Sequence, residues 1–284
     1  MTLVVWANGR IVLPEEPVVS ALDHGLTVGD GVFESCIVTG GTPFALARHL
    51  ERLHDSADRI GLAGIDDDAV RTAIGHVLAV GAGEVNRVRI TVTSGPGPLG
   101  SRRGDGPLTL IVVGSRGAAP AQCRVVRAPW RRNEHSPLAG VKSTSYGEAA
   151  VIAQYARDRG ADEAIIANTA GDLCEGSASN VFVERGGEVL TPPVAAGCLA
   201  GVSRALALEW GTAAGLPVRV AEPGELPYSV LDDVLGARAH LALSASSRGV
   251  QAVDSLDGRA LDPGPLLAEL SAIYASEAAN NPNP

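Results

Sequence analysis

The chain has 284 residues, 45% of them hydrophobic, and a formal net charge of -9. This composition suits one large or two ordinary globular domains, and the scattered arginines form no basic face, so we expect no nucleic-acid partner. No apolar run approaches the roughly 20 residues that span a bilayer, and the N-terminus lacks a basic and apolar leader pattern, which predicts a soluble, cytoplasmic protein with no membrane partner.

The first part of the chain predicts strands and helices in mixed order. A strand is expected at 6–13, with a turn at Asn8-Gly9, and a helix at 48–62, where apolar residues recur at helical spacing. A second helix near 67–80 precedes a strand at 86–95, where Val88, Ile90 and Val92 alternate with polar residues. The small, unpatterned residues 115–122 make the best linker. We therefore predict a small N-terminal domain, 1–118, and a larger C-terminal domain, 119–284.

The second part begins with an expected strand at 123–130, and Lys142 then stands just before a helix that Gly160 would cap. Short strands follow in 162–168, 173–184 and 188–193, with Glu175 placed just after a strand. A helix starts near Gly201, a strand covers 238–246, and a last helix leads to a disordered-looking tail, NNPNP. The order of elements predicts an α+β or mixed α/β protein of two unequal parts, with a strand-rich core in the larger.

Lys142 is the only lysine, against 22 arginines. A coding bias toward arginine explains the general depletion but not the exception. Arginine cannot condense with an aldehyde, whereas a lysine amine can lose its proton and form a Schiff base. Lys142 is therefore either a chance survivor on the surface or a residue kept for its chemistry. The four cysteines lie far apart without CxxC spacing, which favours reduced thiols and predicts no metal site.

Other residues supply what a pyridoxal phosphate site needs besides the lysine: an acid for the ring nitrogen and donors for a phosphate. Glu175 lies among small residues in LCEGSASNVF. The helix start at Gly201-Val202-Ser203 offers unpaired N–H groups, and Ser246 stands in a serine cluster, LSASSRG. Taken singly, these are a solvated glutamate, an ordinary helix cap and a polar turn.

Together, eight segments resemble the class IV, fold-type IV pyridoxal phosphate family in their order. The segments are DHGLTVGDGVFES, RHLERLHDSA, LAGVKSTSYGE, ADEAIIAN, LCEGSASNVF, EVLTPP, CLAGVSR and LSASS, between about residues 6 and 256. That family includes branched-chain and D-amino-acid aminotransferases and 4-amino-4-deoxychorismate lyase. EGSASNVF and GVSR at their mutual spacing are its most specific motifs.

The resemblance implies a pyridoxal 5'-phosphate enzyme of two-domain fold type IV that acts on a small amino substrate, and a homodimer. It implies that Lys142 forms the Schiff base, and that Glu175 binds the pyridine nitrogen. It further implies that Arg52, Val202, Ser203 and Ser246 contact the phosphate, and that Tyr146 reaches the phenolic oxygen of the cofactor. Without the resemblance, Arg52 would be interpreted as an exposed arginine on a helix.

The reaction depends on a variable loop. D-amino-acid enzymes hold the substrate carboxylate with an arginine and a histidine in the region matching TSGPGPLGS, where this chain has Leu99 and Ser101. Arg89 matches an arginine by which branched-chain enzymes bind dicarboxylates, although it could equally be a solvent-facing strand residue. GDGVFES, SGPGPLG and RNEHSPLAGVK resemble arginine-rich aminodeoxychorismate lyases most. We therefore favour the lyase, which gives pyruvate and 4-aminobenzoate, a folate precursor, with a ping-pong aminotransferase as the alternative.

Two further readings remain at the level of sequence. Lys142 with Ser143 and Ser145 resembles a Ser-Lys hydrolase pair, and an inactive binding protein could keep the fold without the reaction. Both predict a colourless protein, whereas a Schiff base on Lys142 predicts a yellow one.

Overall fold

The computed structural model describes residues 3–118 and 121–284 and divides the chain into two compact units. Unit 1 comprises residues 3–118, 141–146 and 282–284, and unit 2 comprises 121–140 and 147–281. The predicted domain boundary and part of the predicted linker fall at 119–120, outside the described residues. The short segment 141–146, which carries Lys142, has its contacts in unit 1.

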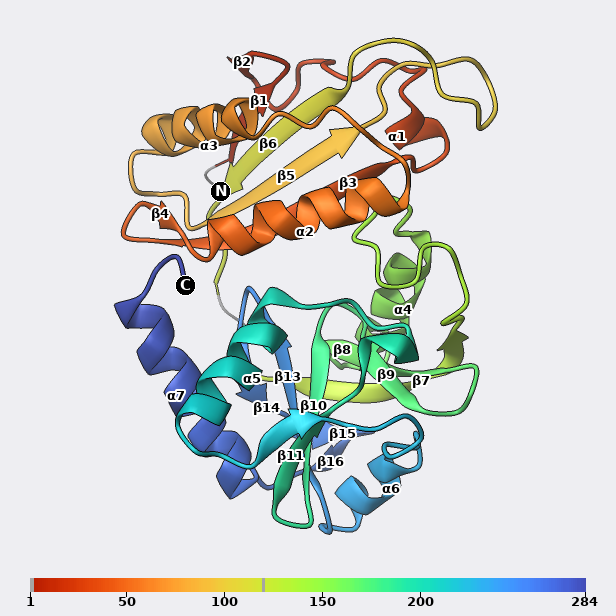
Figure 1. Cartoon of the computed structure of the whole chain (residues 1–284), viewed down its shortest axis with the longest axis vertical. Helices are drawn as coiled ribbons and strands as arrows, with labels where there is room; N and C mark the ends of the chain where they lie inside the picture. Colours follow the sequence, from red (N-terminus) through yellow and green to blue (C-terminus); the bar gives the residue numbers. More distant parts are fainter. Residues whose placement is uncertain (1–2, 119–120) are drawn as a thin grey trace. The chain divides into compact units, whose positions relative to one another are not determined.

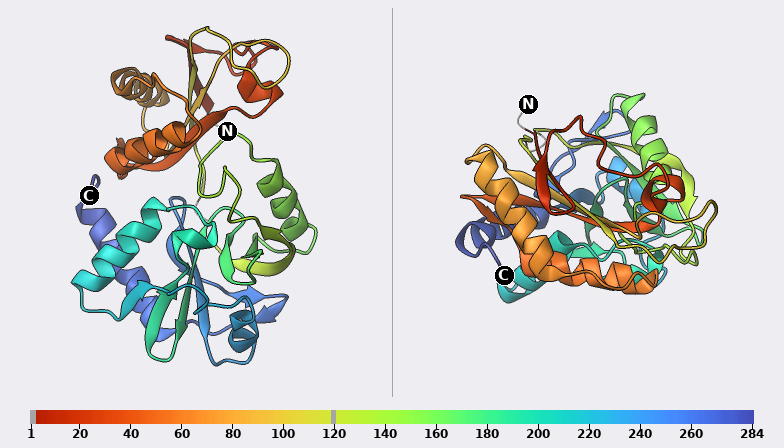
Figure 2. Two further views of the ribbon diagram at one scale, coloured as in Figure 1. Left: turned by 45° about the vertical axis from the view of Figure 1, so that its right-hand side comes forward. Right: turned by 90° about the horizontal axis from the view of Figure 1, so that it is seen from above.

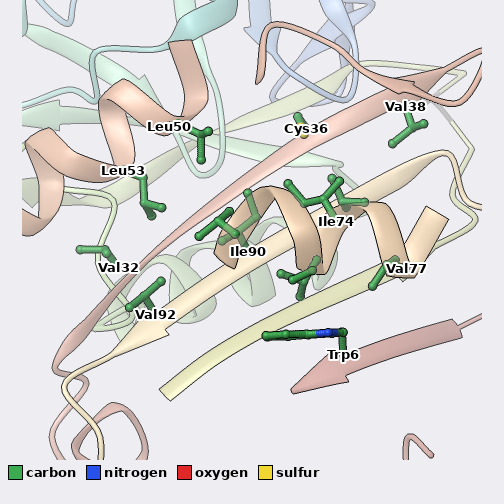
Figure 3. Packing of buried hydrophobic residues seen from close by; sticks show 14 of the residues in the cluster. Trp6, Val32, Cys36, Val38, Leu50, Leu53, Ile74, Val77, Ile90 and Val92 are labelled. Carbon is green, nitrogen blue, oxygen red and sulfur yellow. The ribbon is translucent and has the colours of Figure 1, made fainter. Parts of the chain in front are cut away.

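Unit 1 is built on one six-stranded sheet in the order β2-β1-β6-β5-β3-β4, with α2 and α3 packed against it (Figure 1). The core lies between these helices and the sheet, where Leu50 and Leu53 of α2 meet Val32 and Cys36 of β3 (Figure 3). The elements are β1 (Leu3–Ala7), β2 (Arg10–Val12), α1 (His24–Thr27), β3 (Gly31–Thr39), β4 (Thr42–Pro43), α2 (Leu46–Arg59), α3 (Asp67–Gly81), β5 (Arg87–Thr93) and β6 (Thr109–Ser115).

The helix and strand patterns predicted for unit 1 are confirmed in α2, α3 and β5. In β5, Val88, Ile90 and Val92 are buried while Arg89 is exposed, so the strand has one covered and one open face. The same alternation sends Phe33 of β3 to the face opposite Val32 and Cys36. The face of the sheet opposite this core therefore carries Arg89, which is exposed, and Phe33, which is buried.

Unit 2 holds two five-stranded sheets, in the orders β12-β11-β10-β13-β14 and β16-β15-β7-β8-β9. Apolar residues of both sheets and of α6 form one core cluster, and α5 and α7 lie side by side (Figure 1, Figure 2). The elements are β7 (Arg124–Arg132), α4 (Gly147–Arg157), β8 (Glu163–Asn168), β9 (Leu173–Gly176), β10 (Asn180–Arg185), β11 (Glu188–Thr191), η1 (Val194–Ala196), α5 (Val202–Ala213), β12 (Val218–Val220), α6 (Val230–Leu235), β13 (His240–Ala245), β14 (Gly249–Ala252), β15 (Ser255–Leu256), β16 (Arg259–Ala260) and α7 (Pro265–Asn280).

Two local predictions are wrong. Glu175 lies within β9 rather than after a strand. The tail is also ordered. Ala45, the N-cap residue of α2, has φ +51° and its side chain caps no N–H group, and the last residues accept hydrogen bonds from the free N–H groups at this helix start. The N–H of Ala45 donates to the carbonyl of Pro282 (2.8 Å), and the N–H of Ala47 donates to Oδ1 of Asn283 (3.0 Å).

Candidate active site

The Lys142 segment is fixed along the first part of β3. The N–H of Phe33 donates to the carbonyl of Lys142 (2.9 Å), and the N–H of Thr144 donates to the carbonyl of Gly31 (2.8 Å). The N–H of Lys142 donates to Oγ of Ser56 on α2 (3.2 Å). Backbone bonds on both sides of Lys142 thus hold its Cα against the sheet, while its side chain is half-buried.

Phe33 is the residue around which three predicted site residues of unit 1 gather. Nζ of Lys142 lies 4.5 Å from the centroid of the Phe33 ring, and the guanidinium carbon of Arg89 lies 3.7 Å from it. The ring of Tyr146 meets the same ring edge to face at 5.0 Å. Phe33 was missed as a site residue, although the alternation in GVFES, which separates Phe33 from Val32 and Cys36, was a usable signal.

Arg52 lies on the helix side of the same strand, in a buried ion-pair network. Its Nε and Nη2 each donate to an oxygen of Glu34 at 2.7 Å, and Nδ1 of His49 lies 2.7 Å from the same carboxylate. Burial alone would raise the pKa of Glu34, but the charge of Arg52 and the hydrogen bonds from His49 and Arg52 lower it to about 2. Arg52 is 12% exposed, so the interpretation as an exposed helix arginine does not hold.

In unit 2, Glu175 is held from two directions and is 12% exposed, which excludes a freely solvated side chain. Nη2 of Arg132 donates to Oε1 of Glu175 (3.0 Å), and the N–H of Leu199 donates to Oε2 (2.9 Å). A cation and a backbone donor both stabilise the charged form of a carboxylate. Arg132 also pairs with Glu148 of α4 (3.0 Å). No sequence signal distinguishes Arg132 from the other arginines.

The N-terminus of α5 presents Val202 and Ser203 as the sequence predicts. Gly201 is the N-cap residue and no side chain caps the helix, so its first N–H groups have no partner from a capping side chain. A Cβ on Gly201 would clash with Oδ1 of Asn180, so a larger residue there would have to displace that side chain. Oγ of Ser203 is buried and accepts a hydrogen bond from the Tyr274 hydroxyl (3.1 Å), which leaves its own proton available to an acceptor.

Ser246 begins the turn between β13 and β14, and it is half-buried. Ser244, two residues earlier, has a buried hydroxyl with no hydrogen-bond partner among the described residues. A buried hydroxyl without a partner is rare in folded proteins and calls for an acceptor.

The predicted residues divide between the units. Unit 1 brings Lys142, Tyr146 and Arg89 together at Phe33 and places Arg52 in the Glu34 network, and unit 2 carries Glu175, Val202, Ser203 and Ser246. Each unit by itself carries groups that suit pyridoxal phosphate. Unit 1 offers the amine of Lys142, and unit 2 offers the anchored carboxylate of Glu175, a helix start without a capping side chain and the unsatisfied hydroxyl of Ser244.

Other kinds of centre find little support in the described ranges. No group of histidine, cysteine and acidic residues within 3–118 and 121–284 is arranged to hold a metal ion. The four cysteines are free and buried, and burial raises the pKa of Cys36, Cys123 and Cys198 to about 12, so these thiols stay protonated at neutral pH. No helix in the part of the chain that the structure describes is long and apolar enough to cross a membrane.

The model of the family called amino-transferase class IV matches residues 31–256. This chain belongs to the class IV aminotransferases. Members of this family depend on pyridoxal phosphate, and the predicted mixed α/β fold of type IV is confirmed. A hypothetical aminotransferase of Mycobacterium tuberculosis in its PLP-bound form is 25% identical, with a TM-score of 0.81 over 96% of this chain and 99% of that one.

Curated relatives of this class IV chain carry different activities. A branched-chain-amino-acid aminotransferase of Pseudomonas aeruginosa is 29% identical over 215 residues, which are 71% of this chain and 70% of that protein. A bifunctional aminodeoxychorismate lyase / D-amino acid transaminase of Mycobacterium tuberculosis is 27% identical over 294 residues, covering 93% of this chain and 94% of the relative. The family is therefore established, and the reaction within it is not decided by similarity.

Proposed function

We propose that this class IV enzyme is a 4-amino-4-deoxychorismate lyase, which releases pyruvate and 4-aminobenzoate. The observation that carries the proposal is the arrangement at Phe33, where Lys142 and Arg89 approach one aromatic ring at 4.5 and 3.7 Å. An amine that reacts with the cofactor and a guanidinium that binds a carboxylate thus flank an apolar ring. The substrate is an unsaturated carbocycle with an amino group and carboxylates, so it offers a partner for each of these groups.

Each residue has a defined task in this proposal. Bound pyridoxal phosphate supplies an electron sink for the bond that breaks. Lys142 is the residue that holds the cofactor, and its amine then takes the proton from the substrate carbon that bears the amino group. Glu175, anchored by Arg132 and Leu199, provides the negative charge for the pyridine nitrogen. Arg52, Val202, Ser203 and Ser246 hold the phosphate, and Tyr146 lies beside the same ring as Lys142.

The loop after β5 supports the lyase over a D-amino-acid enzyme. Leu99 and Ser101 occupy the places where an arginine and a histidine would be needed, and Leu99 is 87% exposed. Arg103 in this loop is already engaged, since Nε and Nη2 donate to the carboxylate of Asp30 at 2.7 and 2.6 Å. The loop therefore lacks the arginine and histidine pair at these two places, and we assign Arg89 of β5 to the substrate carboxylate.

An aminotransferase is the second candidate, and Arg89 also favours it. A guanidinium beside the reactive lysine can hold the distal carboxylate of a dicarboxylic amino donor as well as a ring carboxylate. The relative from Pseudomonas aeruginosa gives this candidate weight. Both candidate reactions use the same residues of this chain. The lyase releases pyruvate from the substrate, whereas the aminotransferase removes its amino group.

A product assay separates the two candidates. Purified enzyme is given 4-amino-4-deoxychorismate, and 4-aminobenzoate and pyruvate are quantified; in parallel it is given branched-chain, D- and dicarboxylic amino acids with keto acids. We expect equal amounts of 4-aminobenzoate and pyruvate to form when no keto acid is added to the reaction. Turnover that requires a keto acid, with no 4-aminobenzoate, would replace the lyase by the aminotransferase.

Arg89→Gln adds a test of the carboxylate anchor. We expect a higher KM with a smaller change in kcat, because a binding contact is lost while Lys142 and Glu175 stay. Arg87→Gln, in the same strand and on the same face, is the matched control and should leave KM unchanged. The homodimer is expected from the resemblance alone, and light scattering of the pure protein tests the oligomeric state.

A further inference from the structure

A buried ion pair in unit 2 joins two turns. One is 176–179, which follows Glu175, and the other is 246–248, which contains Ser246. Nη2 of Arg248 donates to Oε1 of Glu163 at 2.6 Å, and the two side chains are only 7% and 6% exposed. Glu163 is the first residue of β8, and Arg248 ends the turn that begins at Ser246. Burying a charge is costly unless it is paired and hydrogen-bonded, so this pair holds its two segments at a fixed separation.

The other oxygen of Glu163 organises the turn that follows Glu175. Oε2 accepts from the hydroxyl of Ser179 (2.7 Å), the N–H of Ala178 (3.0 Å) and the hydroxyl of Ser177 (3.4 Å). A Cβ on Gly176 would lie 2.8 Å from this oxygen, so the glycine leaves room for the carboxylate. One carboxylate therefore fixes the whole turn 176–179.

Arg248 plays the corresponding part for the turn 246–248. Its Nη1 donates to Oε1 of Gln251 (3.2 Å) and to Sγ of Cys123 (3.1 Å), and its N–H donates to the carbonyl of Ala245 (3.0 Å). The guanidinium thus ties the end of the turn to β14 and to the residue before β7, as well as to Glu163. This leaves little freedom for Ser246, two residues away.

The sheet places these two turns next to each other. Asn180 at the start of β10 pairs with Ser244 near the end of β13 in an antiparallel ladder. The turn before Asn180 and the turn after Ser244 therefore leave the ladder at the same end, and the Glu163–Arg248 pair spans them. The ion pair therefore couples the two turns in addition to the ladder that joins their strands.

We propose that Glu163 and Arg248 are positioning residues that hold the turn 246–248 so that the Ser246 hydroxyl is presented to the phosphate of the cofactor. The inference rests on the proposed role of Ser246 as a phosphate ligand. Its consequence is selective: loss of the pair weakens the contact with the phosphate and spares the contacts made by Lys142 and Glu175 with the rest of the cofactor.

Binding of pyridoxal phosphate and of pyridoxal, which lacks the phosphate, tests this selectivity. Each aldehyde is titrated into the apoprotein of the wild type and of Arg248→Gln, and dissociation constants are taken from the visible absorbance. We expect Arg248→Gln to bind pyridoxal phosphate about tenfold or more weakly, as for one lost hydrogen bond to a charged group. Pyridoxal should bind both proteins equally. Arg238→Gln, which breaks the exposed pair with Asp233 in the same unit, should change neither constant.

A second variant guards against misfolding. Arg248→Gln leaves the Glu163 charge buried without its partner, so the double variant Glu163→Gln/Arg248→Gln removes both charges together. It should show the same loss for pyridoxal phosphate alone, with a wild-type circular dichroism spectrum. Equal weakening of both aldehydes, or wild-type affinity for pyridoxal phosphate in the folded double variant, overturns the positioning role. A wild type that binds neither aldehyde contradicts the proposed function itself.

Discussion

Replacing Glu34 by glutamine should destabilise unit 1 by about 3 kcal/mol at neutral pH. The pKa of Glu34 is about 2 in the folded protein, against the usual 4.5. Each pKa unit is worth about 1.4 kcal/mol, so the charged form of Glu34 stabilises the folded state by about 3 kcal/mol. Removing one partner of a buried ion pair costs about 3 to 5 kcal/mol in other proteins, which is consistent. Arg52 and His49 would lose the carboxylate that both contact.

The pH dependence gives a second signature of the same network. Because the pKa of Glu34 is lowered in the folded state, its contribution is fully present above about pH 4.5 and is lost as the pH falls through about 2. The difference in unfolding free energy between wild type and Glu34→Gln should therefore shrink steadily from pH 5 downward.

Urea unfolding followed by the fluorescence of Trp6 measures this difference, because Trp6 lies in the core of unit 1. Trp130 and Trp210 belong to unit 2 and are replaced by phenylalanine in both proteins. Glu84→Gln is the control, since Glu84 forms an exposed pair with Arg116 in the same unit and should contribute below about 1 kcal/mol. A Glu34→Gln protein as stable as Glu84→Gln, or a difference independent of pH, would refute the reasoning.

Three further predictions concern the proposed site. The pure protein should be yellow, and borohydride should attach the cofactor to the peptide containing Lys142. Lys142→Arg should be folded and inactive, and borohydride should attach no cofactor to it, as peptide mapping would show. Arg52→Lys keeps a positive charge beside Glu34 but loses the two-pronged geometry, so the cofactor should dissociate faster on dialysis; unchanged retention would remove Arg52 from the phosphate site. Glu175→Gln should still bind the cofactor yet remove the substrate proton about a hundredfold or more slowly in single turnovers, and a wild-type rate would show that the wrong acid was chosen.

Local patterns were enough to predict the elements that bury one regular face. The helical spacing of Leu50 and Leu53 predicted α2, and the alternation of Val88, Ile90 and Val92 predicted β5. These predictions succeed because each element packs its apolar side on one neighbouring layer, so its own sequence records the burial. Family membership, and with it the cofactor and the fold, followed from the order of the motifs.

The missed features depend on partners distant in the sequence. Glu34 is completely buried in a strand, a position that only makes sense once His49 and Arg52 of α2 surround it. Arg132 anchors Glu175, which lies 43 positions later in the chain, and the residues next to Arg132 in the sequence do not predict that contact. Periodicity describes one element at a time, so pairs of charges from separate elements escape it.

The tail shows the same limitation in another form. Its composition of asparagine and proline is typical of disordered termini, and the order it has here comes from the uncapped start of α2. The sequence of the tail alone does not predict its contact with that helix.

Unit 1 is discontinuous in the chain, and this has a consequence for its synthesis. It draws residues 141–146 to the edge of β3 and residues 282–284 to the start of α2, so two of its contacts are made by segments that leave the ribosome late. The sheet and helices of 3–118 can form early, but the segment with Lys142 arrives only after the connection through 140 has been made. The hydrogen bonds to the start of α2 form only after Pro282 and Asn283 have been added. A fragment ending at 118 would therefore be an incomplete unit, without its reactive lysine and with one helix start bare.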